Sequence, residues 1–166
     1  MTMAENGNEG RPAAAPQAQS IGVIAQYVKD LSFESPGAPN SVRARTAAPS
    51  INIGVNVQSR GVPGNELEVE LRIEASAREG EQIVFAIELV YGGLFKLNNV
   101  SPETLQLVAM IECPRLLFPF ARQIIADASR NGGFPPLLID PIDFVQLYRQ
   151  RIAQMNAAQP RATPDA

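Results

Sequence analysis

The chain has 166 residues and a formal net charge of −3, with 45% hydrophobic residues, 19% charged residues and no tryptophan. This length fits one domain, and the scattered basic residues disfavour sequence-independent binding to nucleic acid or to an anionic membrane. Histidine is absent, so the commonest general base and metal ligand is missing and most catalytic templates are excluded. The single cysteine, Cys113, cannot form an intramolecular disulfide, which favours a reducing compartment.

The two ends of the chain differ in composition from its middle. Residues 1–20 and 157–166 are rich in small and polar residues and in proline, and such segments bury too little apolar surface to offset chain entropy. We therefore expect two disordered tails around one domain at residues 21–156. The first tail has Glu5 and Glu9 where a signal peptide would carry positive charge, and no apolar run approaches the length of a membrane span. These features predict a cytoplasmic protein that does not insert into a membrane.

Four segments in the first half of the domain alternate apolar and polar residues, as strands do. They cover residues 27–34, 50–58, 66–75 and 82–91. In the first segment Tyr27, Leu31 and Phe33 share one face, and Lys29 interrupts the pattern. Short glycine-containing turns after the second and third segments favour antiparallel pairing. The fourth segment is apolar on both faces, which is typical of a central strand.

The second half of the domain predicts three helices. They are expected over residues 102–108, 116–130 and 141–155. Ser101 should cap the first helix, Gly132 and Gly133 should end the second, and Asp140 should cap the third. Pro119 fits the second helix only in its first turn. Strands followed by helices, without a repeat, indicate an α+β domain.

The residues that could form a phosphate site, a nucleophile or a metal site are better explained by structural roles. Gly92 and Gly93 match no phosphate-binding motif and are predicted to form a turn. Cys113 precedes Pro114 in an apolar stretch, so a buried, inert thiol is expected rather than a nucleophile. No acidic cluster has the spacing of a calcium loop. The sequence therefore predicts a binding protein without cofactor or metal, and an enzyme that uses only carboxylates stays an alternative.

An acidic face is predicted on the sheet. Asp30 and Glu34 project from one face of the first strand, and Glu88 joins them if that strand pairs with the fourth. Glutamates among residues 66–74 could extend this negative charge, which a basic partner could recognise. The alternative is a charged exterior that only keeps the protein soluble.

Apolar residues outnumber what a one-sided helix needs at residues 116–120. Part of this run is expected to face another subunit, because an uncovered patch of leucine and phenylalanine would aggregate. The alternative is a two-layer domain that buries the whole run internally.

Four blocks of sequence, in the right order, carry a resemblance to a known family. They are residues 27–39 (YVKDLSFESPGAP), 91–95 (YGGLF), 113–122 (CPRLLFPFAR) and 132–144 (GGFPPLLIDPIDF). The chain resembles the SecB family of bacterial export chaperones. The resemblance implies an α+β fold, a four-stranded antiparallel sheet packed with C-terminal helices, assembled as a dimer of dimers. It also implies an ATP-independent holdase that binds unfolded precursor polypeptides, keeps them translocation-competent and passes them to SecA, the motor of the export channel.

The resemblance further implies roles for particular residues. The surface for SecA would comprise Asp30, Glu34, Glu88 and Ala86, where the family often carries a larger apolar residue at the position of Ala86. The surface for clients would comprise Ile51, Ile53, Val55, Phe144, Leu147 and Tyr148. The long helix would lie near the centre of a homotetramer, with an interface formed by Cys113, Leu116, Leu117, Phe120 and Ile124. A small oligomeric adaptor that binds one folded partner through the acidic face stays the alternative function.

Overall fold

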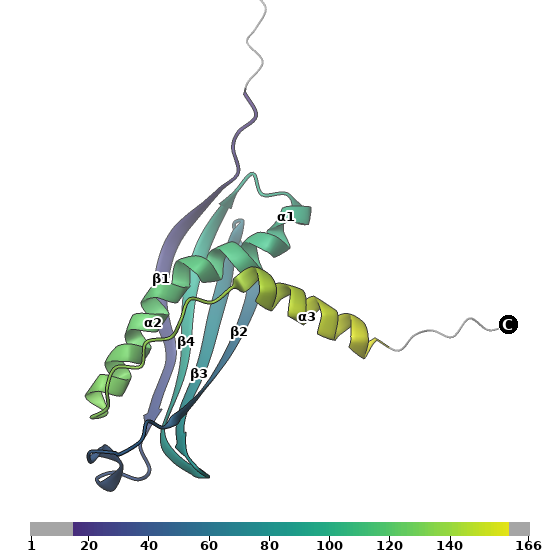
Figure 1. Ribbon diagram of the computed structural model, residues 1–166. Coiled ribbons are helices and arrows are strands. Elements are labelled where there is room, and N and C mark those ends of the chain that lie inside the picture. The colour runs from purple at the N-terminus through teal and green to yellow at the C-terminus, as the bar shows by residue number, and fades with distance from the viewer. Residues whose placement is uncertain (1–14, 160–166) are drawn as a thin grey trace, which may run out of the picture.

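The computed structural model describes residues 15–159, which form one sheet and a set of helices on one side of it (Figure 1). The strands are β1 (Ser20–Glu34), β2 (Ser50–Val62), β3 (Glu66–Glu79) and β4 (Gln82–Asn98). The helices are α1 (Pro102–Leu107), the π-helical η2 (Val108–Glu112), α2 (Cys113–Asn131) and α3 (Phe144–Ala158), and a short 3-10 helix, η1 (Asn40–Val42), follows β1. Most of the two predicted tails, 1–20 and 157–166, lies outside the described residues.

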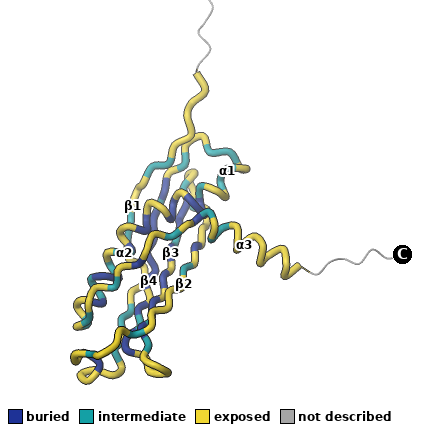
Figure 2. Tube along the Cα trace, in the orientation of Figure 1, coloured by how far each residue is buried: buried dark blue, intermediate teal, exposed yellow. Residues whose placement is uncertain are grey.

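The sheet has the strand order β1-β4-β3-β2, and all three pairings are antiparallel. This confirms the predicted four-stranded sheet and the central place of the fourth strand. The α+β class is confirmed as well, because α2 packs along β4 and β3 on one face (Figure 1). The core lies between that face and α2, and Figure 2 shows the buried residues gathered there. Its fully buried side chains include Leu71, Ile73, Leu89, Phe95, Leu117 and Ile125.

Gly92 and Gly93 lie inside β4, so the turn predicted at these residues is wrong. Both positions need glycine because other side chains occupy the space beside them. A Cβ on Gly92 would lie 2.6 Å from the ring of Tyr27, and a Cβ on Gly93 would lie 2.6 Å from the ring of Phe95. The glycine pair therefore allows close packing on both faces of the strand.

The predicted alternation in β1 fails at Lys29. The register with β4 shifts there, because Val28 pairs with Tyr91 and Asp30 pairs with the next residue, Val90. Such a bulge leaves one residue unopposed and changes which face the flanking side chains occupy. Tyr27 consequently faces away from the helices, on the same side as Asp30, and does not share a face with Leu31 and Phe33.

The first two predicted helices are one continuous helical run, because η2 joins α1 to α2. Pro119 therefore lies well inside α2 rather than in its first turn. Proline has no backbone N–H to donate to the preceding turn. The ring of Pro119 is exposed, so this missing hydrogen bond lies on the solvent side of the helix. Ser101 caps α1 as predicted, accepting a hydrogen bond from the backbone N–H of Thr104.

The continuous run Pro102–Asn131 also corrects the expectation about membrane spans. By length and composition it is apolar enough to cross a membrane, and it is the one such helix among residues 15–159. Its most apolar window is 44% buried in the fold, because α2 covers the sheet. The helix therefore has a partner surface within the chain itself.

The last helix begins later than predicted. Asp143 caps α3, accepting a hydrogen bond from the backbone N–H of Gln146 at 3.0 Å, whereas Asp140 lies in an extended segment. That segment is held along α2 by two contacts. The hydroxyl of Ser129 accepts from the N–H of Leu137 at 2.8 Å, and the side chain of Arg122 donates to the carbonyl of Ile139 at 2.7 Å.

Candidate binding surfaces

The sheet face opposite the helices, here called the outer face, carries the predicted acidic residues. Glu34 pairs with Ala86, and Ser32 pairs with Glu88, so Asp30, Glu34, Ala86 and Glu88 share this face across β1 and β4. Glu88 therefore lies with Asp30 and Glu34, because β1 pairs with β4. Glu74, one of the glutamates among residues 66–74 that could extend the charge, lies on β3 and pairs directly with Glu88.

We call Asp30, Glu34, Glu74 and Glu88 the acidic patch. All four side chains are exposed, and none forms an ion pair within the described part of the chain. Ala86 is half-buried among them. Unneutralised carboxylates side by side produce a negative potential that attracts a basic partner.

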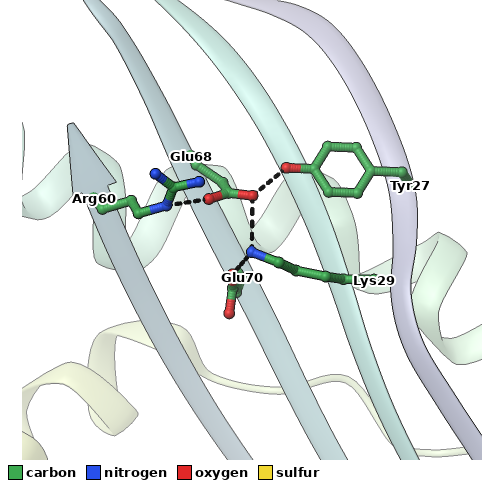
Figure 3. Close-up of polar contacts among 5 residues, drawn as sticks. All are labelled: Tyr27, Lys29, Arg60, Glu68 and Glu70. Atoms are coloured by element: carbon green, nitrogen blue, oxygen red, sulfur yellow. Dashed lines mark hydrogen bonds and ion pairs between the residues drawn. The ribbon is translucent and has the colours of Figure 1, made fainter. Parts of the chain in front are cut away.

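A second group of charges on the outer face is neutralised (Figure 3). The hydroxyl of Tyr27 donates to one carboxylate oxygen of Glu68, and the ammonium of Lys29 lies 3.2 Å from the same oxygen. Lys29 also pairs with Glu70, and the guanidinium of Arg60 donates to the other oxygen of Glu68. We call these five residues the Glu68 network. Glu68 and Glu70 therefore do not extend the acidic patch.

Glu68 is the buried centre of this network, with 5% of its surface exposed. The hydrogen bond from Tyr27 lowers the pKa of Glu68, and the donors Lys29 and Arg60 act in the same direction against the opposing effect of burial. The hydrogen bond to Glu70 raises the pKa of Lys29. The network thus favours the charged forms of Glu68 and Lys29. It links β1, β3 and β2 on one face of the sheet.

A groove between β2 and α3 brings together four of the six predicted client residues. It is lined by Ile53, Val55, Leu147 and Tyr148 and continues past Met110 to Arg151, with a cavity of about 400 Å³ at its inner end. We call it the α3 groove. It is open to solvent, and its apolar side chains lie beside polar ones such as Asn56, Gln150 and Gln154, which suits a segment of extended chain that carries both apolar and polar side chains.

Phe144 does not line the α3 groove. Its side chain is 1% exposed and packs edge-on against Phe118, with ring centroids 6.1 Å apart. The prediction that Phe144 contacts clients is therefore corrected, because this ring fixes the start of α3 to the core. The apolar periodicity of α3 could not distinguish this core residue from its groove-lining neighbours.

Ile51 lies in a second groove that sequence reasoning missed. Two mostly irregular segments, residues 41–49 with the end of η1 and residues 133–137, form its walls around Phe85, and its cavity measures about 590 Å³. We call it the loop groove. The rings of Phe85 and Phe134 pack there with centroids 4.8 Å apart. Irregular segments have no periodic pattern, so the apolar composition of residues 133–137 was the only available signal.

The predicted oligomer residues divide into two groups. Leu116 and Phe120 are 43% and 52% exposed on α2, and Ile124 is half-buried beside them. Cys113 and Leu117 are fully buried inside the subunit, so these two have no surface left to offer a second subunit. Burial raises the pKa of the Cys113 thiol to about 12, which agrees with the expected inert thiol.

Exposed apolar side chains continue from α2 onto the free edge of the sheet. Val23, Ile24, Val28 and Leu31 of β1 are all exposed, and β1 has a sheet neighbour on one side only. An edge strand with an uncovered apolar margin is a site for pairing with another chain.

Known proteins resemble the chain over most of its length. The family described as preprotein translocase subunit SecB matches residues 14–155. The protein-export protein SecB of Agrobacterium fabrum is 55% identical over 163 residues, covering 98% of this chain and 99% of the relative. The protein-export protein SecB of a Bradyrhizobium species is 54% identical over 154 residues, covering 93% of this chain and 94% of the relative.

A solved structure shares the fold. It is a SecB-like chaperone from Mycobacterium tuberculosis in complex with a peptide from an antitoxin, and it superposes with a TM-score of 0.61 at 14% identity. The match covers 74% of this chain and 91% of that chain.

Proposed function

The chain belongs to the SecB family of protein-export chaperones, and from this premise we propose that it is an ATP-independent holdase. It binds unfolded precursor polypeptides, keeps them translocation-competent and delivers them to SecA. It works in the cytoplasm without a cofactor, without nucleic acid and without inserting into a membrane. The observation that carries the proposal is a partly exposed apolar strand, β2, between two open grooves.

Client binding relies on β2 and the two grooves beside it. Ile51 and Ile53 are 42% and 40% exposed. Burying a fully exposed side chain of this kind contributes about 1.5–3 kcal/mol, so covering the exposed part of each contributes about 0.6–1.3 kcal/mol. An unfolded client supplies apolar segments that a folded protein hides. Many weak contacts along a flexible client then give tight overall binding without any sequence code.

The backbone of β2 offers a second source of affinity. The strand pairs with β3 on one side only, so its other edge is available to an extended client segment. Backbone hydrogen bonds do not depend on side-chain identity, which fits a chaperone for many precursors.

Delivery uses the acidic patch. Its four carboxylates face away from both grooves, so SecA can dock while a client is bound. Release needs no nucleotide bound to the chaperone, because SecA captures both chaperone and client.

Assembly is a dimer of dimers, with α2 near the centre of the tetramer. The interface is carried by the exposed residues Leu116 and Phe120, with Ile124 at its margin, and not by Cys113 or Leu117. Four subunits present several copies of each groove, which raises the effective concentration of sites for one client.

Holdase activity is tested by refolding. A denatured, aggregation-prone protein is diluted into buffer with and without the purified chain, and light scattering is followed. The wild type should suppress scattering at stoichiometric amounts of tetramer, and Ile51→Ser with Ile53→Ser should suppress it less. The control is Ile83→Ser, which removes an isoleucine of similar exposure outside the grooves. No suppression by the wild type would favour the adaptor that binds one folded partner.

Docking of SecA is tested by charge reversal. Asp30→Lys with Glu34→Lys should weaken SecA binding and leave client binding unchanged. Glu81→Lys with Asp140→Lys makes the same change in net charge at exposed positions outside the acidic patch, and it should bind SecA nearly as the wild type does. Equal SecA affinity for the wild type and the Asp30/Glu34 variant would contradict the proposed docking surface.

A further inference from the structure

The bulge in β1 decides where Asp30 points. Tyr27 and Asp30 are three residues apart, and in a regular strand an odd spacing places two side chains on opposite faces. Here both lie on the outer face, because Lys29 is the extra residue between the pairs Val28–Tyr91 and Asp30–Val90. The acidic patch therefore includes Asp30 only while the bulge stays at this position.

Two side chains tie the bulge to the middle of the sheet. From β1, Tyr27 and Lys29 reach across β4 to Glu68 on β3. They can do so because Gly92 lies beneath the Tyr27 ring and has no side chain. Glu68 is a fixed anchor, since Arg60 of β2 holds its second oxygen and the residue is buried.

Lys29 is the member of the network that belongs to the bulge itself. Its ammonium contacts both Glu68 and Glu70, so it spans two positions of β3. Glu34, in contrast, follows Phe33, whose ring is packed near Phe85 and Phe134. The orientation of Glu34 is thus set by packing, whereas that of Asp30 depends on the tie at Lys29.

We propose that Lys29 is a positioning residue for SecA docking: its ion pairs with Glu68 and Glu70 fix the bulge that turns Asp30 into the acidic patch. This inference rests on the proposed docking of SecA at the acidic patch. In this inference the cationic side chain of Lys29 holds Asp30 within the acidic patch.

The sign of the effect separates positioning from simple electrostatics. Removing a positive charge from a surface that binds a basic partner should strengthen binding if charge alone matters. Loss of the tie should instead weaken binding, because Asp30 is no longer held in place. A contact of this kind changes affinity by about two- to tenfold, from the 0.5–1.5 kcal/mol typical of one hydrogen-bonded contact and 1.4 kcal/mol per tenfold.

The experiment compares SecA affinity for the full chain and its variants by calorimetry at one ionic strength. Lys29→Met should weaken binding about two- to tenfold, and Lys29→Arg should restore it, because a guanidinium can make the same ion pairs. The control is Arg72→Met, which removes an exposed cation of β3 from the same face, where Arg72 forms no ion pair within residues 15–159. It should bind SecA as tightly as the wild type or more tightly.

Double variants locate the effect. If Lys29 acts through Asp30, adding Asp30→Asn to Lys29→Met should cost little further affinity, whereas adding Glu34→Gln should cost its full single-variant amount. Hydrogen exchange should quicken at residues 27–31 of Lys29→Met and stay unchanged in β3, which confirms that the variant is folded. Suppression of client aggregation should match the wild type.

Three results would overturn the inference: equal or tighter SecA binding by Lys29→Met, failure of Lys29→Arg to restore binding, or full additivity with Asp30→Asn. A wild type that does not bind SecA would overturn the docking proposal and this inference together. A wild type that binds SecA beside a Lys29→Met variant of equal affinity would overturn the inference alone.

Discussion

At the scale of single residues, Gly92 shows how one missing side chain organises the outer face. A Cβ there would lie 2.6 Å from the Tyr27 ring, so Gly92→Ala must displace the ring that donates to Glu68. We expect a loss of about 1–3 kcal/mol in the free energy of unfolding, as for overpacked sites. Urea denaturation measures it, with Gly61→Ala as the control, because a Cβ on Gly61 meets nothing within 4 Å. Equal midpoints for the two variants would contradict the packing role of Gly92.

Glu68 predicts a dependence of stability on pH. Its pKa is lowered in the folded state, so its contribution is present above the ordinary value of 4.5 and is lost as the pH falls through the lower folded value. The wild type should therefore lose more stability than Glu68→Gln between neutral pH and about pH 3. Urea midpoints over this range test the difference. A Glu66→Gln variant should follow the wild type, and parallel curves for all three proteins would exclude the assigned role of Glu68.

At the scale of the elements, alternation was a sufficient guide to the four strands, and the apolar residues on both faces of β4 indicated its central place, because β3 and β4 carry most of the buried positions of the sheet. The exceptions have local causes. The bulge at Lys29 is stabilised by partners on β3 that lie 39 and 41 residues away in sequence, so no local pattern reveals it. Separate helices were predicted over residues 102–108 and 116–130, but η2 joins them, and Pro114 and Pro119 both lie within the continuous helical run.

Beyond its first turns, the α3 helix is hydrogen-bonded to β2 by one side chain among residues 15–159. The guanidinium of Arg151 donates to the backbone carbonyl of Val57, while the rest of the helix end is exposed. Arg151→Ala should therefore loosen the C-terminal turns of α3, and hydrogen exchange there should become faster. Arg149→Ala removes a nearby arginine that forms no ion pair within residues 15–159 and should leave the exchange rates unchanged. Unchanged exchange in Arg151→Ala would show that Tyr148 and the core contacts alone hold the helix.

At the scale of the whole molecule, one sheet separates two kinds of surface. The helix side carries the two grooves and the exposed part of α2, and the outer face carries charge. This division follows from the alternation of side chains along each strand, which sends apolar residues to one side and polar residues to the other. This separation fits the proposed function, in which a client and a basic partner bind without competing for area.

The single subunit leaves apolar side chains of α2 uncovered, which a second subunit could cover. Phe120 is half-exposed on α2 next to Leu116, and in a two-fold symmetric interface each contact occurs twice, because both subunits contribute the same residues. Phe120→Glu would place a charge in each copy of that contact, so the proposed tetramer should dissociate into smaller species in analytical ultracentrifugation. Met155→Glu introduces the same charge at a residue of similar exposure on α3, and it should leave the tetramer intact. A wild type that sediments as a monomer, or two variants that both stay tetrameric, would contradict this role of α2. The exposed apolar surface of α2 would then be tested for client binding, where Phe120→Glu should reduce the suppression of aggregation.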